Sequence, residues 1–107
     1  MNVPSTHPRP GHTLIIGDVD WSLMLLPDES VQLVVTSPPY WSIKDYEHRG
    51  QIGCQDSYEA YLDRLESVWR ECARVLEPGC KIAINVGDQF LRARDHGVYR
   101  VAPIHAD

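Results

Sequence analysis

Two adjacent prolines directly follow a short apolar run, and this junction constrains the fold more than any other feature of the sequence. Residues 31–35 (Val-Gln-Leu-Val-Val) have the length and composition of a buried strand. Proline fixes φ, lacks a backbone N–H and holds the preceding residue extended, so Pro38 and Pro39 can neither continue a sheet nor enter a helix interior. The chain must therefore leave the strand in a stiff turn, residues 36–41, that ends in two aromatic residues.

The segments around this turn alternate between strand and helix patterns. Residues 13–16 and 81–86 also read as strands, and residues 56–76 carry apolar side chains at steps of three and four. This spacing predicts an amphipathic helix, with Asp56 as its N-cap and Pro78-Gly79 as its end. The alternation of predicted strands and helices predicts an α/β fold with a parallel sheet and right-handed crossovers.

Polar residues follow the carboxyl ends of the three predicted strands. Asp18 comes after the first strand, where Gly17 would permit a positive φ, Ser37 comes after the second, and Asp88 follows the third. In parallel sheets, ligands bind outside the carboxyl ends of the strands. We therefore expect these residues to share one site at one edge of the sheet.

The remaining segments read as connections. Residues 1–12 hold three prolines and a glycine and predict a flexible leader, which leaves residues 13–107 as the α/β domain. Residues 41–56 and 89–100 lack a clean period and predict loops. The best candidates for contacts to phosphate groups lie in these loops: Lys44, Arg49, Arg92, Arg94 and Arg100. For each of them, a side chain that is only solvated is an equally good interpretation.

Composition bounds the function classes. A length of 107 residues suits one small domain, and a net charge of −5 argues against a broad basic face for nucleic acid. Neither a membrane-spanning stretch nor a signal segment is present, so we expect a cytoplasmic protein. The histidines lack metal-ligand spacing, and no metal is expected. The three cysteines form no Cys-x-x-Cys pair and read as buried thiols: Cys54, Cys72 and Cys80.

The turn after the second strand has the groups needed to hold an amine on a planar ring. The Ser37 hydroxyl and a proline carbonyl can both accept hydrogen bonds from an exocyclic NH2 group. Tyr40 can stack on the ring, and Trp41 could widen that platform. Two other interpretations remain: a stiff surface turn, or a proline-rich ligand for an aromatic groove, against which the preceding buried strand argues.

Residues 36–41 (Thr-Ser-Pro-Pro-Tyr-Trp) resemble motif IV of the amino-group DNA methyltransferases, in which Asp, Asn or Ser precedes Pro-Pro and an aromatic residue. The segments on both sides are similar to the same family: residues 14–18 (Leu-Ile-Ile-Gly-Asp), 26–31, 69–79 and 82–88. The resemblance implies a Rossmann-like fold and a methyltransferase that depends on S-adenosylmethionine.

The resemblance also implies roles for individual residues. Ser37, Pro38, Pro39 and Tyr40 would hold a base flipped out of double-stranded DNA. Asp18 matches the acidic residue near the adenosine end of S-adenosylmethionine, with Thr36 and Ser37 also at the cofactor. Serine at the first motif position resembles the cytosine-N4 enzymes more than the adenine-N6 enzymes.

One part of the family pattern is missing from the sequence. In this class a Phe-x-Gly-x-Gly cofactor motif and a target-recognition region come later in the chain, and neither occurs here. The family's sheet also places two further strands between those matching residues 13–16 and 31–36. We therefore expect a fragment with an incomplete sheet and no methyl transfer by itself. The alternatives are adenine-N6 methylation, methylation of a protein glutamine, and a non-catalytic binding module or remnant.

Overall fold

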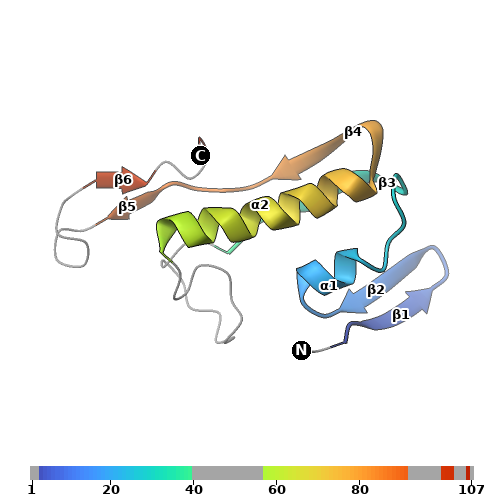
Figure 1. The fold of residues 1–107 in the computed structure, drawn as a ribbon. Helices are drawn as coiled ribbons and strands as arrows, with labels where there is room; N and C mark the ends of the chain where they lie inside the picture. The colour runs from blue at the N-terminus through green and yellow to red at the C-terminus, as the bar shows by residue number, and fades with distance from the viewer. Residues whose placement is uncertain (1–2, 40–56, 92–99, 103–105, 107) are drawn as a thin grey trace. The chain divides into compact units, whose positions relative to one another are not determined.

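The computed structural model describes residues 3–39, 57–91, 100–102 and 106. Its elements follow in the order β1 (Ser5–Arg9), β2 (His12–Ile16), α1 (Val19–Leu23), β3 (Val31–Thr36), α2 (Tyr58–Val75), β4 (Leu76–Ile84), β5 (Gln89–Leu91) and β6 (Arg100–Ala102) (Figure 1). The chain divides into two units, one of residues 1–34 and 66–82 and the other of residues 35–65 and 83–107. No helix in the described part is long and apolar enough to cross a membrane.

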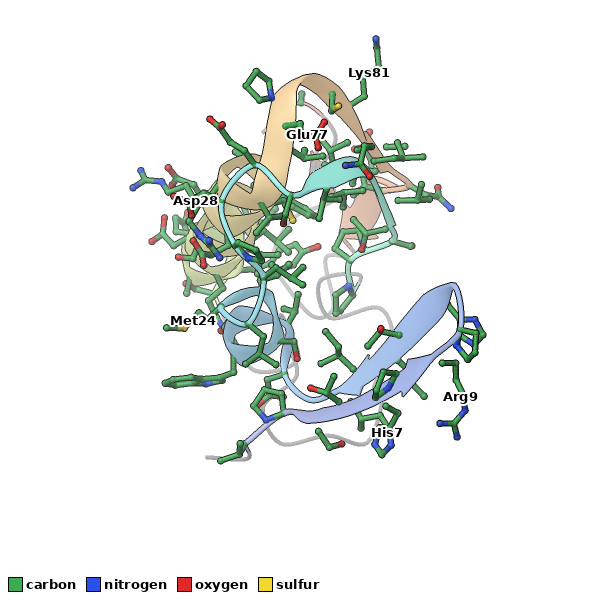
Figure 2. The ribbon with its side chains drawn as sticks, turned by 90° about the vertical axis from the view of Figure 1, so that its right-hand side faces the viewer. His7, Arg9, Met24, Asp28, Glu77 and Lys81 are labelled. Carbon is green, nitrogen blue, oxygen red and sulfur yellow. The ribbon has the colours of Figure 1, made fainter. Side chains whose placement is uncertain are left out.

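β1 and β2 form an antiparallel hairpin where the sequence predicted a flexible leader. The register runs from Arg9 opposite His12 to Ser5 opposite Ile16. Pro10 and Gly11 make the connection, and the φ of 80° at Gly11 suits the third position of a type II turn, in which proline favours the second. Figure 2 shows the side chains of His7 and Arg9 extending outward from β1. The proline and glycine that suggested a leader are thus turn residues.

The described strands form three separate pairs rather than one sheet. β3 and β4 pair in parallel across α2, as predicted, whereas β1 with β2 and β5 with β6 are antiparallel. β2, which covers the predicted strand of residues 13–16, is not part of the β3–β4 sheet and pairs with β1 instead. A strand must satisfy its backbone N–H and C=O groups, and the adjacent segment of chain supplies those partners here.

α2 confirms the predicted amphipathic helix. Its N-cap is Ser57, whose hydroxyl accepts the Ala60 N–H at 3.2 Å; the predicted cap, Asp56, lies outside the described residues. Apart from Pro38, every buried apolar side chain found among the described residues belongs to α2, at spacings of four, three, four and three: Tyr61, Leu65, Val68, Cys72 and Val75. These side chains lie on one face of the helix, so the periodicity predicted the core correctly.

α2 ends at Val75, and β4 begins at once, before the Pro78-Gly79 pair that was expected to stop the helix and separate it from a strand over residues 81–86. The backbone N–H groups of Glu29 and Ser30 donate to the carbonyls of Arg74 and Val75, at 3.0 and 2.8 Å. These bonds satisfy carbonyls that a helix end leaves without partners. A distant turn therefore ends this helix, and local sequence could not reveal it.

Arg74 ties the end of α2 to the end of α1 and to the segment between α1 and β3. Its guanidinium donates to the carbonyls of Leu23 and Leu26 at 2.9 and 3.0 Å, and to the carboxylates of Asp28 and Glu71 at 2.7 and 2.9 Å. Two hydrogen bonds raise the pKa of Arg74, and the bond to Glu71 has a larger effect than the bond to Asp28. The planar guanidinium suits this role because it presents several N–H donors in fixed directions.

Candidate active site

The backbone of Asn85, the residue after β4, fixes the start of the turn that follows β3. The Asn85 N–H donates to the Thr36 carbonyl at 2.9 Å, and the Asn85 carbonyl accepts the Ser37 hydroxyl at 3.1 Å. One residue thus holds two successive residues of the turn, one through its N–H and the other through its C=O. Thr36 is half-buried, whereas Ser37 is exposed at the carboxyl end of β3.

The hydrogen bond to Asn85 decides what Ser37 can offer a ligand. A serine hydroxyl has one proton and two lone pairs, so it can donate once and accept twice. Its proton is directed to the Asn85 carbonyl. Toward any further partner, Ser37 is therefore a hydrogen-bond acceptor.

The two prolines continue the turn in different environments. Pro38 is buried, and Pro39 is half-buried. The Pro39 carbonyl accepts the phenol of Tyr61 on α2 at 2.7 Å, and the Tyr61 side chain is 0% exposed. The turn is therefore anchored at Thr36 and Ser37 by Asn85, and at Pro39 by Tyr61.

Sequence reasoning missed the contact between Tyr61 and Pro39, because Tyr61 fell within the apolar stripe and was read as core alone. One signal was present: a buried tyrosine, unlike leucine or phenylalanine, brings a hydroxyl that needs a partner. Asn85 was missed for a different reason, since both of its bonds come from the backbone and leave no mark on the choice of side chain.

Several predicted residues cannot be placed against this turn. Tyr40 and Trp41 lie outside the described residues, as do Lys44, Arg49, Arg92 and Arg94. Asp88 is exposed between β4 and β5, in the same unit as Ser37. Asp18 belongs to the other unit, so the expected common edge of Asp18, Ser37 and Asp88 stays a prediction.

Asp18 is the N-cap of the short helix α1. Its carbonyl accepts the Ser22 N–H at 2.9 Å, but its exposed carboxylate makes no capping hydrogen bond. Gly17 does not have the positive φ that was expected. A Cβ there would lie 2.9 Å from the Cα of Pro4 and 3.1 Å from the Ser22 hydroxyl, so the close approach of these groups favours glycine.

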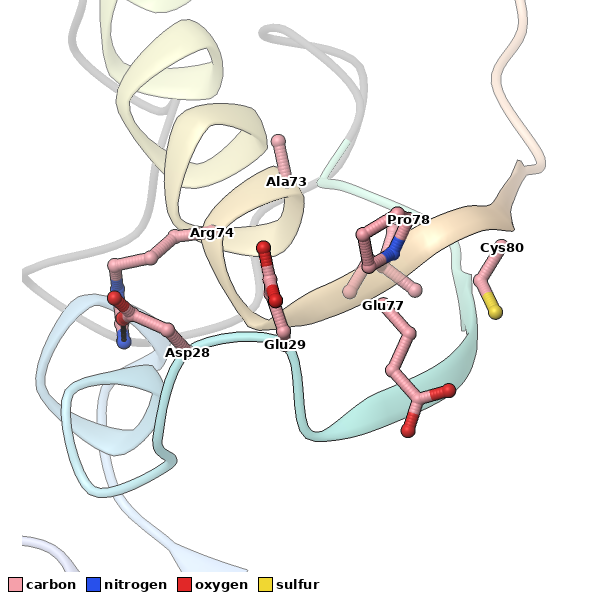
Figure 3. A pocket seen from close by; sticks show the side chains of 8 residues that line it. Asp28, Glu29, Ala73, Arg74, Glu77, Pro78 and Cys80 are labelled. Atoms are coloured by element: carbon pink, nitrogen blue, oxygen red, sulfur yellow. Dashed lines mark hydrogen bonds and ion pairs between the residues drawn. The ribbon is translucent and has the colours of Figure 1, made fainter.

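An open pocket of about 470 Å³ lies in the first unit and includes none of the predicted site residues (Figure 3). Arg74 reaches Asp28 on one side of it, and Cys80 lies on β4 at the other. Cys80 is half-buried, whereas Cys72 is buried as predicted, and Cys54 is outside the described residues. Burial, with a smaller effect of Glu71, raises the pKa of the Cys72 thiol.

Comparisons with known proteins find similarity in the part of the chain that carries the turn. A family model described as DNA methylase matches residues 31–103. The type II methyltransferase M.SfiI of Streptomyces fimbriatus is 44% identical over 86 residues, which is 80% of this chain and 20% of that protein. M.Cfr9I of Citrobacter freundii is 41% identical over 80 residues, covering 75% of this chain and 27% of that protein. The chain thus spans about a fifth to a quarter of the length of these relatives.

A solved structure has a similar fold. TTHA0409 of Thermus thermophilus, assigned to the DNA modification methylases, matches with a TM-score of 0.64 and 44% identity over 85% of this chain and 34% of that chain. The likeness confirms the predicted fold class, a partial Rossmann-like α/β methyltransferase fold. With the family match over most of the sequence, it shows that the chain belongs to the amino-group (N6 and N4) DNA methylase family.

Proposed function

We propose that this chain supplies the amine-holding part of a DNA methyltransferase that methylates the exocyclic N4 of cytosine. The carrying observation is the bond from Ser37 to the Asn85 carbonyl at 3.1 Å, which leaves Ser37 as an acceptor. An exocyclic NH2 group is a donor of two protons, so an exposed acceptor at a strand end matches it. Serine at this position favours cytosine N4, and adenine N6 is the alternative.

The proposed turn acts by positioning. The Ser37 oxygen accepts one amine proton, and the Pro38 carbonyl accepts the other, while the Pro39 carbonyl accepts the Tyr61 phenol. Two acceptors that draw the amine protons out of the ring plane make the nitrogen pyramidal, so its lone pair is no longer conjugated with the ring and can face the methyl donor. Tyr40 stacks on the flipped base, and transfer is direct, without a covalent bond between enzyme and base.

S-adenosylmethionine would supply the electrophilic methyl group. The residues that we assign to holding it are Asp18, Thr36 and Ser37. The exposed Asp18 carboxylate fits this role, since it makes no capping bond and its oxygens can accept hydrogen bonds from ribose hydroxyls. The sequence has no Phe-x-Gly-x-Gly motif, so we assign further cofactor contacts to residues beyond these 107 and expect no methyl transfer by the 107 residues alone.

Methyl incorporation tests this function. The natural gene product that carries this chain would be incubated with duplex DNA and S-adenosylmethionine tritiated on the methyl group, beside the 107 residues alone. Radioactivity should enter DNA with the gene product and not with the 107 residues. A folded gene product that binds S-adenosylmethionine but labels no DNA would overturn the proposal. Failure to bind the cofactor as well would support a non-catalytic remnant.

A further inference from the structure

Tyr61 contacts the proposed site although it lies in the core of α2. Its phenol donates to the Pro39 carbonyl at 2.7 Å, and its ring is 0% exposed. Pro39 and Tyr61 lie 22 residues apart in sequence, so the bond joins the turn after β3 to the N-terminal part of α2. Phenylalanine would fill nearly the same volume, so the hydroxyl must be explained by the bond that it makes.

The geometry of proline makes this bond decisive for the direction of the chain. The pyrrolidine ring fixes φ at Pro39, so ψ is the one soft backbone dihedral left at this residue. Rotation about ψ moves the Pro39 carbonyl and, with it, the peptide that leads into Tyr40. A donor held rigidly in a helix core therefore selects one value of ψ.

We propose that Tyr61 is a positioning residue for methyl transfer: its phenol fixes the Pro39 peptide and thereby the direction in which the chain leaves the turn. This inference rests on the proposed function, since it assigns that turn to holding the exocyclic amine. The turn then has a fixed point on each side of the buried Pro38, the Asn85 backbone at Ser37 and the Tyr61 phenol at Pro39. Both fixed points lie within one unit of the chain.

Removal of one oxygen tests the inference. In the natural gene product, Tyr61→Phe should lower the single-turnover rate of methyl transfer about tenfold to a hundredfold, because small errors in position are costly to catalysis. The affinity for S-adenosylmethionine should stay unchanged. Replacement of Tyr61 by p-aminophenylalanine, which keeps a donor at the same place, should restore most of the rate. Leu65→Val is the control, since it trims the same buried face of α2 and an apolar side chain makes no hydrogen bond to the turn.

A second measurement follows the bond itself. The natural gene product labelled with carbon-13 at proline carbonyls should show a change in the chemical shift of the Pro39 carbonyl upon Tyr61→Phe, and none upon Leu65→Val. An unchanged shift would show that the bond is absent and would overturn the inference. A changed shift with an unchanged transfer rate, or an equal loss of rate in Leu65→Val, would overturn the positioning role. No methylation by the parent protein would instead refute the proposed function, and the role of Tyr61 with it.

Discussion

The direction of one hydroxyl proton governs the chemistry assigned to Ser37. A serine exposed at a strand end could donate or accept, and the Asn85 carbonyl removes the first choice. The same hydroxyl without this carbonyl could offer its proton to the amine nitrogen and quench the lone pair that must attack. The backbone of the residue that follows β4 thus makes an ordinary serine a defined acceptor.

Ser37→Ala should lower the methyl-transfer rate by about a hundredfold to a thousandfold, the range seen when one preorganised hydrogen-bonding group is removed from a reacting centre. The measurement is single-turnover transfer by the natural gene product. Ser37→Asn serves as the matched control because its side-chain oxygen keeps an acceptor, and it should retain more activity than Ser37→Ala. A Ser37→Ala protein as active as the parent would remove Ser37 from the mechanism.

Cys72 gives a prediction about alkaline pH. Burial raises the pKa of its thiol above the ordinary value of 9.0, so the unfolded chain loses this proton at lower pH than the folded chain. Its contribution to stability is therefore fully present below pH 9.0 and is lost as pH rises through the raised pKa. Urea unfolding measured at increasing pH, from below 9.0 upward, should show a steeper alkaline loss of stability in the parent than in Cys72→Ala. Parallel curves would contradict the raised pKa.

At the scale of elements, Arg74 links two parts of the chain through hydrogen bonds of defined direction. It joins α2 to two backbone carbonyls and one carboxylate of the segment before β3. Arg74→Lys keeps the charge but loses the fork of donors, so it should lower the urea midpoint clearly. Arg70→Lys is the matched control, since Arg70 makes only an exposed pair with Glu66 among the bonds described, and it should change the midpoint little. Equal effects would contradict the role assigned to Arg74.

α1 contains an unfavourably buried hydroxyl, and a substitution that removes it should increase the stability of the protein. The Ser22 hydroxyl is buried beside Gly17 and has no hydrogen-bond partner among the described residues. A buried polar group without a partner costs about 1–3 kcal/mol, and alanine also favours helix. Ser22→Ala should therefore raise the free energy of unfolding by roughly 1 kcal/mol, measured by urea titration. A loss of stability would mean that the hydroxyl is bonded in solution.

The sequence predicted those elements whose causes are local. The stripe from Tyr61 to Val75 and the strand before Pro38 follow from periodicity and from the backbone limits of proline. The β1–β2 hairpin was missed because prolines spaced along residues 4–10 suggested a leader, although Pro10-Gly11 is also a turn pair. The early end of α2 and the roles of Asn85 and Tyr61 depend on partners far along the chain, which no local pattern encodes.

At the scale of the whole molecule, the described residues bury little apolar surface. Apart from Pro38, the buried apolar side chains among them all lie on α2, whereas Leu14 and Ile16 on β2 are 57% and 56% exposed, and Leu33 on β3 is 57% exposed. Strands that read as core strands in sequence thus expose their large side chains here. Stability is a small difference between burial and chain entropy, so we expect the 107 residues alone to be marginally stable.

The turn of Ser37, Pro38, Pro39 and Tyr40 is proposed to direct a methyl group onto an exocyclic amine. The most direct test is mass spectrometry of nucleosides from DNA treated with the natural gene product and S-adenosylmethionine carrying a trideuteriomethyl group. We expect labelled N4-methylcytosine, and labelled N6-methyladenine would replace the first target by the alternative. Labelled 5-methylcytosine, or no labelled nucleoside from a folded, cofactor-binding protein, would contradict transfer to an exocyclic amine.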